Sequence, residues 1–321
     1  PLVLLGRARS AEDAAAWEEV IADSHLRSWM FVKRGTEAIA QEDFQDLVDK
    51  VPWEELVGVT GEVTRKTAWM VRGDCRCPYA YGQDVVAPAP MPCWLVEMMR
   101  RWLGDLELPE EDLPNSVNLN LYEHGGHGVG WHADDEPLFQ GKKQDARIVS
   151  VSLGQSRRFR LGLRGHKRRA ETGQLRKLKN FPDKKSISDV TLDHGDLCTM
   201  EGLFQKHFVH QVSRSKAPDQ PHAPRVNATF RWIVQHASPC PRHVPGSDPE
   251  EDDAAAPGPR RRRNRKAKKG RSALAVAGLR GLRAPIRPGL QTVSSGSSSL
   301  SSSSSNEDSE DSDSSSEIVY Q

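Results

Sequence analysis

The residues best suited to chemistry lie in the glycine-rich stretch GHGVGWHADDE, which runs from Gly126 to Glu136. His132 and Asp134 stand two positions apart in it, and residues two apart point the same way in extended chain. Both side chains could therefore bind one cation. A lone His-x-Asp is common by chance, so this pair needs a further ligand before it indicates a metal site.

Further histidines occur in KHFVHQV, which contains His207 and His210. Two histidines and one carboxylate are the protein ligands of the non-haem Fe(II) facial triad, which leaves coordination positions open for small molecules. The residue types thus allow an iron site built from two distant segments.

The next segment, RVNATFR, predicts a strand with one polar and one apolar face, because its residue types alternate with a period of two. The polar face consists of Arg225, Asn227, Thr229 and Arg231. Two arginines opposite a wholly apolar face indicate a buried anionic partner. The alternative is an edge strand with solvated arginines.

Other short segments must position these residues. SVNLNLY, residues 116–122, alternates in the same way and predicts a half-buried strand with a polar second face. Further strands are expected within 147–154, 157–163, 189–192, 196–200 and 206–212. Helices are predicted over 11–24, from capping-box spacing, and over 92–104, from apolar periodicity. Many short strands after a helical start predict a mainly β, α+β fold, a jelly roll with helices packed outside.

Taken in order, the motifs NLYEHGGHGVGWHADDE, RIVSVSLG, HGDLCTM, KHFVHQV and APRVNATFR resemble the AlkB family of Fe(II)- and 2-oxoglutarate-dependent dioxygenases, in particular its nucleic-acid repair members. The resemblance covers roughly residues 60 to 236. It implies a double-stranded β-helix core, with Fe(II) as cofactor and 2-oxoglutarate and O2 as cosubstrates. It also implies oxidative demethylation of N-alkylated bases in DNA or RNA, with release of succinate, CO2 and formaldehyde.

The resemblance assigns roles position by position. His132, Asp134 and His210 would hold iron, and His207 would support the site without binding the metal. Arg225 and Arg231 would hold the far carboxylate of 2-oxoglutarate. The rest of the cosubstrate pocket would be formed by Asn120, Tyr122, Asn227 and Thr229.

Substrate contacts are expected from three groups of residues. Asp135 and Glu136 would accept hydrogen bonds from a base amine. Trp69, Tyr79 or Tyr81, in a segment that resembles the family's nucleotide-recognition lid, would stack on a base flipped out of its helix. Phosphates would be bound by Arg65, Lys66 and the cations of a basic insertion over 164–186, which are Lys167, Arg168, Arg169, Arg176, Lys177 and Lys179.

Composition, the helix and strand patterns and the family resemblance together imply three regions. Residues 1–110 would form the N-terminal helices and the lid, residues 111–236 the jelly-roll core with its insertion, and residues 237–321 an unfolded linker, basic run and Ser/acidic tail. The run Arg260 to Arg271 suggests a nuclear signal or a nucleic-acid arm. No apolar run approaches the roughly 18 residues that span a bilayer, so we expect a protein without a membrane segment. We also expect a monomer, and the odd number of cysteines favours an intracellular location.

Five cysteines, an odd number, favour reduced thiols over a disulfide framework. Cys75-Arg-Cys77 could begin a zinc site, but a second close cysteine pair is missing, so structural zinc is not expected.

Two other functions stay open. With the same iron chemistry the protein could hydroxylate or demethylate protein side chains, and without it the protein could be a non-catalytic nucleic-acid-binding module.

Overall fold

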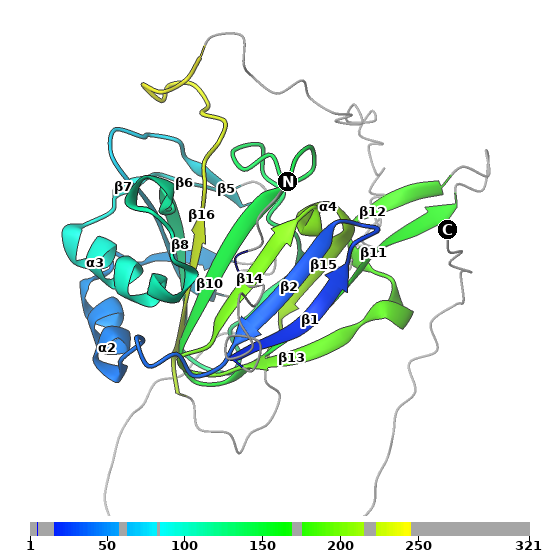
Figure 1. Ribbon diagram of the computed structural model, residues 1–321, viewed down its shortest axis with the longest axis horizontal. Coiled ribbons are helices and arrows are strands. Elements are labelled where there is room, and N and C mark those ends of the chain that lie inside the picture. The colour runs from blue at the N-terminus through cyan, green and yellow to red at the C-terminus, as the bar shows by residue number, and fades with distance from the viewer. Residues whose placement is uncertain are drawn as a thin grey trace, which may run out of the picture. The chain divides into compact units, whose positions relative to one another are not determined.

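Two β-sheets make up most of the folded chain (Figure 1). The computed structural model describes residue 5 and residues 16–57, 63–81, 84–168, 175–214 and 223–244. Within these residues the larger sheet has nine strands. Eight of them follow the spatial order β1 (Trp17–Asp23), β2 (Ser28–Lys33), β14 (Leu197–Gly202), β10 (Ala146–Gly154), β16 (Arg225–Arg231), β8 (Ser116–Tyr122), β4 (Val63–Val71) and β3 (Glu54–Val57), and β7 (Ala89–Pro90) pairs with β4.

The smaller sheet has five strands in the described part of the chain. Their order is β12 (Leu175–Pro182), β11 (Arg157–Arg168), β15 (Phe208–Val212) and β9 (Val129–His132), and β13 (Ser188–Leu192) pairs with β11. A short hairpin joins β5 (Tyr79–Tyr81) to β6 (Asp84–Val86). The helices are α2 (Gln41–Lys50), α3 (Cys93–Trp102), α4 (Phe204–His207) and the 3₁₀ turns η1 (Gly104–Leu106), η2 (Glu110–Asp112) and η3 (Lys184–Ser186).

Side chains along the central strands alternate between the two faces of the larger sheet, and each face carries its own apolar cluster. Leu119 in β8 and Ala228 in β16 belong to a cluster that includes Leu47 of α2 and Leu95 of α3, so the helices cover this face of the larger sheet. Figure 1 shows α2 and α3 together beside β8 and β16. The second cluster joins residues of the larger sheet, such as Ile148, to residues of the smaller one. The layers are therefore helix, sheet and sheet, which confirms the mainly β jelly roll.

Helix α3 confirms the helix predicted over 92–104. Pro92 precedes it, and Leu95, Met98, Met99 and Trp102 on its apolar stripe are buried. The other predicted helix, over 11–24, is wrong where the structure describes it, because residues 17–23 form strand β1.

A bulge explains that error. The register between β1 and β2 shifts between Glu19 and Ile21. Such a bulge moves the following residues to the other face, so that Trp17, Val20 and Ile21 imitate helical spacing. Trp17 packs in the helix-side cluster, whereas Val20 and Ile21 pack against the cluster between the sheets.

Three further features of the fold differ from expectation. Strand β8 is buried along its whole length and not on one face alone, because its polar face lies over a cavity. The insertion over 164–186 is not a plain loop, since it includes the β11–β12 ladder, with Lys167 opposite Arg176. The described part of the chain reaches beyond residue 236 to residue 244, and Cys240 in it is only 4% exposed.

The predicted tail beyond residue 244 lies outside the described residues. Among the described helices, none is long and apolar enough to cross a membrane.

Candidate iron and cosubstrate site

His132, Asp134 and His210 come together although 76 residues separate the last two in sequence. Strands β9 and β15 pair so that His132 lies directly opposite His210, with ring centroids 4.3 Å apart. Asp134 follows β9, and its Oδ1 is 3.8 Å from Nε2 of His132. One ligand atom from each residue can be chosen so that all lie within 4.8 Å of one another. The three donors thus surround a space fit for one metal ion.

Neighbouring groups orient these side chains. Nδ1 of His132 is 2.9 Å from the carbonyl oxygen of Gly130. Because a carbonyl only accepts, Nδ1 must carry the proton, which leaves the Nε2 lone pair available to a metal. The backbone amide of Asp134 donates to Oε1 of Gln205 at 2.9 Å. His210 is 2% exposed, and its Nδ1 has no hydrogen-bond partner among the described residues.

The electrostatic state of the triad suits a divalent cation. Burial by itself would raise the pKa of Asp134, but Arg231 and the two histidines outweigh it and hold that pKa well below its usual range. Burial, helped by His132, lowers the pKa of His210 to about 3. At neutral pH the site therefore presents one carboxylate and neutral imidazole, the protonation states that metal binding requires.

The two arginines of β16 serve opposite ends of the site. Nη2 of Arg231 lies 2.6 Å from Oδ2 of Asp134, and both side chains are almost fully buried. Arg225 is six residues away, which is about 20 Å along an extended strand. Its Nη2 donates to Oγ of Ser152 at 2.9 Å, and its guanidinium lies 5.5 Å from the ring centre of Tyr122. The two therefore do not converge on one carboxylate, contrary to the sequence-based expectation.

Of the two arginines, Arg225 is the better candidate to bind an anion. Its Nε and Nη1 are buried and have no hydrogen-bond partner among the described residues. Burial lowers its pKa to about 10, so it still carries its charge at neutral pH. An unpaired buried guanidinium is costly unless a ligand supplies the anion. Arg231 also has partnerless Nε and Nη1 atoms, but it already has the Asp134 carboxylate.

A cavity of about 390 Å³ lies beside the triad and Arg231. Its wall includes the triad, Arg231 and all four further residues expected to hold the cosubstrate, which are Asn120, Tyr122, Asn227 and Thr229. Asn227 is held by Oγ of Ser150 at 2.7 Å, and Thr229 donates to Oδ1 of Asn227 at 2.9 Å. Arg225 is not on the cavity wall itself, but its guanidinium lies over the ring of Tyr122, and Tyr122 does line the cavity.

The residues expected to contact the base differ in whether an ion pair already occupies them. Glu136 and Tyr79 line the cavity, and the Tyr79 hydroxyl donates to Oε1 of Glu136 at 2.6 Å. Burial, together with Asp134, raises the pKa of Glu136 to about 7. Asp135 also lines the cavity, but its Oδ2 lies 3.1 Å from both Arg164 and Lys142, so it is engaged in ion pairs.

Trp69 does not face the cavity. Its ring centroid lies 4.9 Å from that of Tyr79, and it is absent from the cavity wall, on which Tyr79 lies. It therefore packs on Tyr79 and does not itself line the cavity. The side chain of Tyr81 lies outside the described residues.

The two predicted phosphate contacts on β4 are also not equivalent. Arg65 is buried and lines the cavity, where its Nε donates to Oδ1 of Asn120 at 2.7 Å. It belongs to the cosubstrate end of the site and not to an outer phosphate surface. Lys66 stays partly exposed and pairs with Glu123 at 2.7 Å.

His207 lies in α4 and is not part of the cavity wall, in agreement with the choice of His210 as the triad member. Sequence reasoning missed Gln205, which fixes Asp134, and Arg164, whose Nη2 bridges Asp135 and the carbonyl of Gln205. It also missed Arg157, which lies 5.6 Å from the Tyr122 ring centre. None of these residues belongs to a recognisable motif, so only tertiary contacts reveal them.

Comparison with known proteins shows the family to which the chain belongs. The model of the 2OG-Fe(II) oxygenase superfamily matches residues 24–231. The chain is 31% identical over 207 residues to alpha-ketoglutarate-dependent dioxygenase alkB homolog 3 of Homo sapiens, covering 63% of each protein. It is 32% identical over 126 residues to DNA oxidative demethylase ALKBH2 of Arabidopsis thaliana, covering 37% of this chain and 38% of that protein.

The chain thus spans about 63% of the length of the alkB homolog 3 relative. Solved structures with some likeness include OsALKBH1, which is 18% identical with a TM-score of 0.38 and covers 63% of this chain and 96% of that one. Another is ycfD of E. coli, which is 14% identical with a TM-score of 0.31 and covers 67% of this chain and 54% of that one.

Proposed function

Since the chain belongs to the AlkB family of 2OG-Fe(II) oxygenases, we propose that it is an Fe(II)- and 2-oxoglutarate-dependent demethylase of N-alkylated bases in DNA or RNA. The observation that carries this proposal is the single cavity that holds both the His132–Asp134–His210 triad and the Tyr79–Glu136 pair. The triad suits iron, and the pair beside it suits a planar base with an amine.

The donor set fits the family's cofactor and cosubstrate. His132, Asp134 and His210 would hold Fe(II), and Arg225 would hold the far carboxylate of 2-oxoglutarate beside Tyr122. When bound, iron and 2-oxoglutarate supply the oxidation, in which O2 and 2-oxoglutarate yield succinate and CO2 while an N-methyl group becomes hydroxymethyl and is lost as formaldehyde.

The chain's own residues hold the reactants in place. Arg231 keeps Asp134 ionised and oriented, and Gly130 fixes the His132 tautomer. Tyr79 packs against Trp69 and Phe139, whose ring centroids lie 4.9 and 6.1 Å from its own and 6.2 Å from each other. Oε2 of Glu136 is buried and has no hydrogen-bond partner in the described part of the chain, so it can accept from an exocyclic amine of the base.

The proposal is tested by incubating the full chain with Fe(II), 2-oxoglutarate and oligonucleotides that carry single N-methylated bases. Loss of the methyl group, measured by mass spectrometry of the nucleosides, should match the succinate formed. Peptides with methylated or hydroxylatable side chains form the parallel series. Succinate coupled only to peptides would favour the protein-hydroxylase alternative, and no succinate at all would favour the binding module.

Substitutions at the Tyr79–Glu136 pair should affect the base and not the cosubstrate. Tyr79→Ala removes a stacking surface of about 1–3 kcal/mol, so we expect the KM for a methylated oligonucleotide to rise roughly tenfold. Tyr79→Phe keeps the ring and should raise the KM for the oligonucleotide less. Glu136→Gln keeps the shape but presents a donor as well as an acceptor, and should change which methylated base is preferred.

The control in these experiments is the rate of succinate formation without oligonucleotide, together with the KM for 2-oxoglutarate. Neither should change more than about twofold in Tyr79→Phe. If all three variants process each methylated base as the parent does, the pair is not the base-binding surface.

The basic insertion is proposed to add affinity for phosphates and no chemistry. Lys167 and Arg168 lie in β11, and Arg176, Lys177 and Lys179 lie in β12, a hairpin that Figure 1 shows projecting past the other strands. Neutralising these five residues and Arg169 together should weaken oligonucleotide binding. It should also lower the slope of log affinity against log salt concentration by about 0.7–0.9 for each lost phosphate contact. Fluorescence anisotropy over a salt series measures both quantities.

An unchanged affinity and salt slope would show that the insertion does not contact nucleic acid. The run Arg260 to Arg271 lies outside the described residues. We propose that it directs the protein to the nucleus or binds long nucleic acid, so that deleting residues beyond 244 should leave turnover on short oligonucleotides intact.

A further inference from the structure

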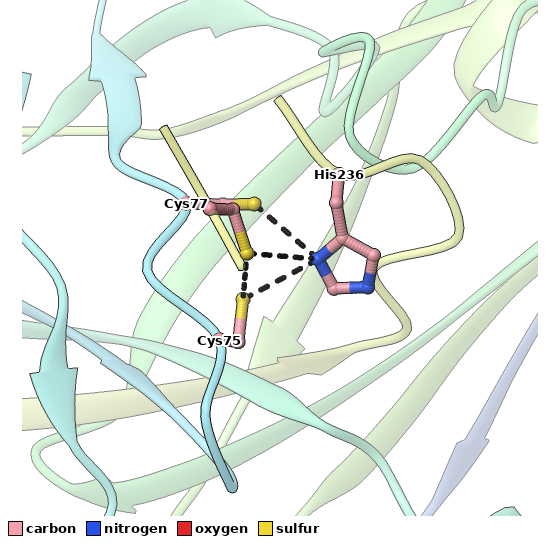
Figure 2. A group of neighbouring side chains, drawn as sticks. Cys75, Cys77 and His236 are labelled. Atoms are coloured by element: carbon pink, nitrogen blue, oxygen red, sulfur yellow. Dashed lines mark hydrogen bonds between the residues drawn. The ribbon is translucent and has the colours of Figure 1, made fainter. Parts of the chain in front are cut away.

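A second cluster of metal-type ligands lies outside the iron site. Cys75 and Cys77, in the segment between β4 and β5, lie beside His236, which follows β16 (Figure 2), and Cys240 completes the cluster. Nδ1 of His236 lies 3.6 Å from Sγ of Cys75, 3.4 Å from Sγ of Cys77 and 3.5 Å from Sγ of Cys240. The sequence offered only the first pair, and the fold supplies the other two ligands.

These distances match the edges of a metal tetrahedron. With bonds of about 2.3 Å to sulfur and about 2.05 Å to nitrogen, tetrahedral zinc places S and N about 3.6 Å apart and two sulfurs about 3.8 Å apart. The Sγ atoms of Cys75 and Cys240 are 3.9 Å apart. That separation is far too long for a disulfide bond of about 2.05 Å.

Hydrogen bonding alone does not explain the cluster. Figure 2 shows the sulfurs converging on one nitrogen of His236. An imidazole nitrogen has one lone pair and accepts one hydrogen bond, so it cannot satisfy three thiol donors. Three thiolates and a neutral imidazole around one cation would satisfy every group at once.

The surroundings are those of a thiolate site. The amide of Arg76 donates to Sγ of Cys240 at 3.3 Å. Such amide bonds orient and stabilise a metal-bound sulfur. Turns in the second segment, in which the amide of Cys240 donates to the carbonyl of Ala237 at 2.9 Å, bring Cys240 to the same side as His236. Cys75, Cys77 and Cys240 are each at most 4% exposed and belong to one apolar cluster.

We propose that Cys75, Cys77, His236 and Cys240 bind one zinc ion in a closed, structural site. Four protein ligands leave no open coordination position, which distinguishes structural from catalytic zinc. Thiolate and imidazole ligands select zinc over the hard cations, and zinc undergoes no redox change beside an oxidative site. A zinc ion with three thiolates carries a net charge of −1, and the guanidinium of Arg76, whose Nη1 donates to the carbonyl oxygen of Cys75 at 2.6 Å, places a positive charge beside it.

A zinc ion at this site would fix the position of the segment that carries Tyr79. Tyr79 lies two residues after Cys77, and the carbonyl of Cys77 accepts the indole N–H of Trp69 at 2.8 Å. Trp69 in turn packs on Tyr79. Zinc would thus join the end of β16 to the segment that presents Tyr79. Zinc binding itself does not depend on the proposed demethylase activity.

The test measures metal content in the full chain, purified under reducing conditions without chelator. His132→Ala is the background, because it disables the iron triad as a second zinc site. About one zinc per chain is expected by mass spectrometry of the metal, and a mercurial thiol reagent added to the folded protein should release it. Cobalt(II) in place of zinc should give the intense sulfur-to-metal charge-transfer band of a thiolate site.

Variants localise the ion. Cys77→Ser and Cys240→Ser should lose the zinc and unfold at a lower temperature. The matched controls are Cys198→Ser, at a buried thiol outside the cluster, and Cys93→Ser, at an exposed one, and both should keep it. Because the mercurial and cobalt measurements use the parent ligand set, misfolding of a variant cannot hide the answer.

The inference is overturned if the folded chain releases no zinc to the mercurial reagent and gives no thiolate band with cobalt. It is equally overturned if iron occupies the thiolate site, or if Cys240→Ser retains a full equivalent of zinc.

Discussion

His132→Ala, Asp134→Ala and His210→Ala are each expected to lower 2-oxoglutarate turnover at least a hundredfold. Each removes one of three donors that the β9–β15 pairing holds within 4.8 Å. A two-ligand remnant would bind Fe(II) weakly and hold it in the wrong geometry. Because the residues lie on or beside paired strands, the fold should persist, as circular dichroism can show. Succinate formation and bound iron per chain are the two measurements.

The matched control is His207→Ala, since His207 is close in sequence but lies in α4, away from the cavity wall. It should keep most of its activity and its iron. Gln205→Ala should have a turnover between that of His207→Ala and that of the triad variants, because Gln205 only orients Asp134 by accepting a hydrogen bond from its backbone amide. Full activity in His210→Ala, or loss in His207→Ala alone, would contradict the ligand assignment.

Arg225→Ala is expected to raise the 2-oxoglutarate requirement more than any other substitution in β16. It removes a buried cation that has two partnerless nitrogens beside Tyr122. Loss of one member of a buried charge pair costs about 2–5 kcal/mol, equivalent to a 30-fold or larger increase in KM for 2-oxoglutarate. Arg225→Lys keeps the charge and should recover part of this loss.

Arg231→Ala should have a different signature. Arg231 is paired with Asp134 at 2.6 Å, so its removal should weaken iron binding and lower kcat as well as affect 2-oxoglutarate. A 2-oxo acid that lacks the far carboxylate separates the two roles. Arg225→Ala should scarcely distinguish it from 2-oxoglutarate, whereas Arg231→Ala should still prefer 2-oxoglutarate. The reverse pattern would exchange the two assignments.

Local patterns predicted the central part of the site well. The alternation in β8 and β16 placed Asn120, Asn227 and Thr229 on one cavity wall, because side chains of a strand alternate between its faces. Helix α3 was equally predictable, since its apolar spacing agrees with its burial. The error at β1 arose where a bulge interrupts the alternation and imitates a helix.

The roles that sequence patterns missed depend on contacts between distant segments. Nothing local distinguishes Asp135 from Glu136, yet one is paired with Arg164 and Lys142 while the other keeps a partnerless oxygen. Likewise Arg65, which a charge pattern places on the surface, lies buried against Asn120. Burial and ion pairing are properties of the packed molecule, so no linear pattern encodes them.

The sequence by itself determined which residue types are present, which strand face each occupies, and the family motifs that unite iron and 2-oxoglutarate chemistry. Only the tertiary structure decided that Arg231 pairs with Asp134 on the cavity wall while Arg225 lies against Tyr122, off that wall. It also brought Cys75 and Cys77 to His236 and Cys240, more than 150 residues away in the chain. The physical reason is that a strand's side-chain alternation is local, whereas metal sites and buried ion pairs need atoms within a few ångströms, and only the packing of distant segments brings such atoms together.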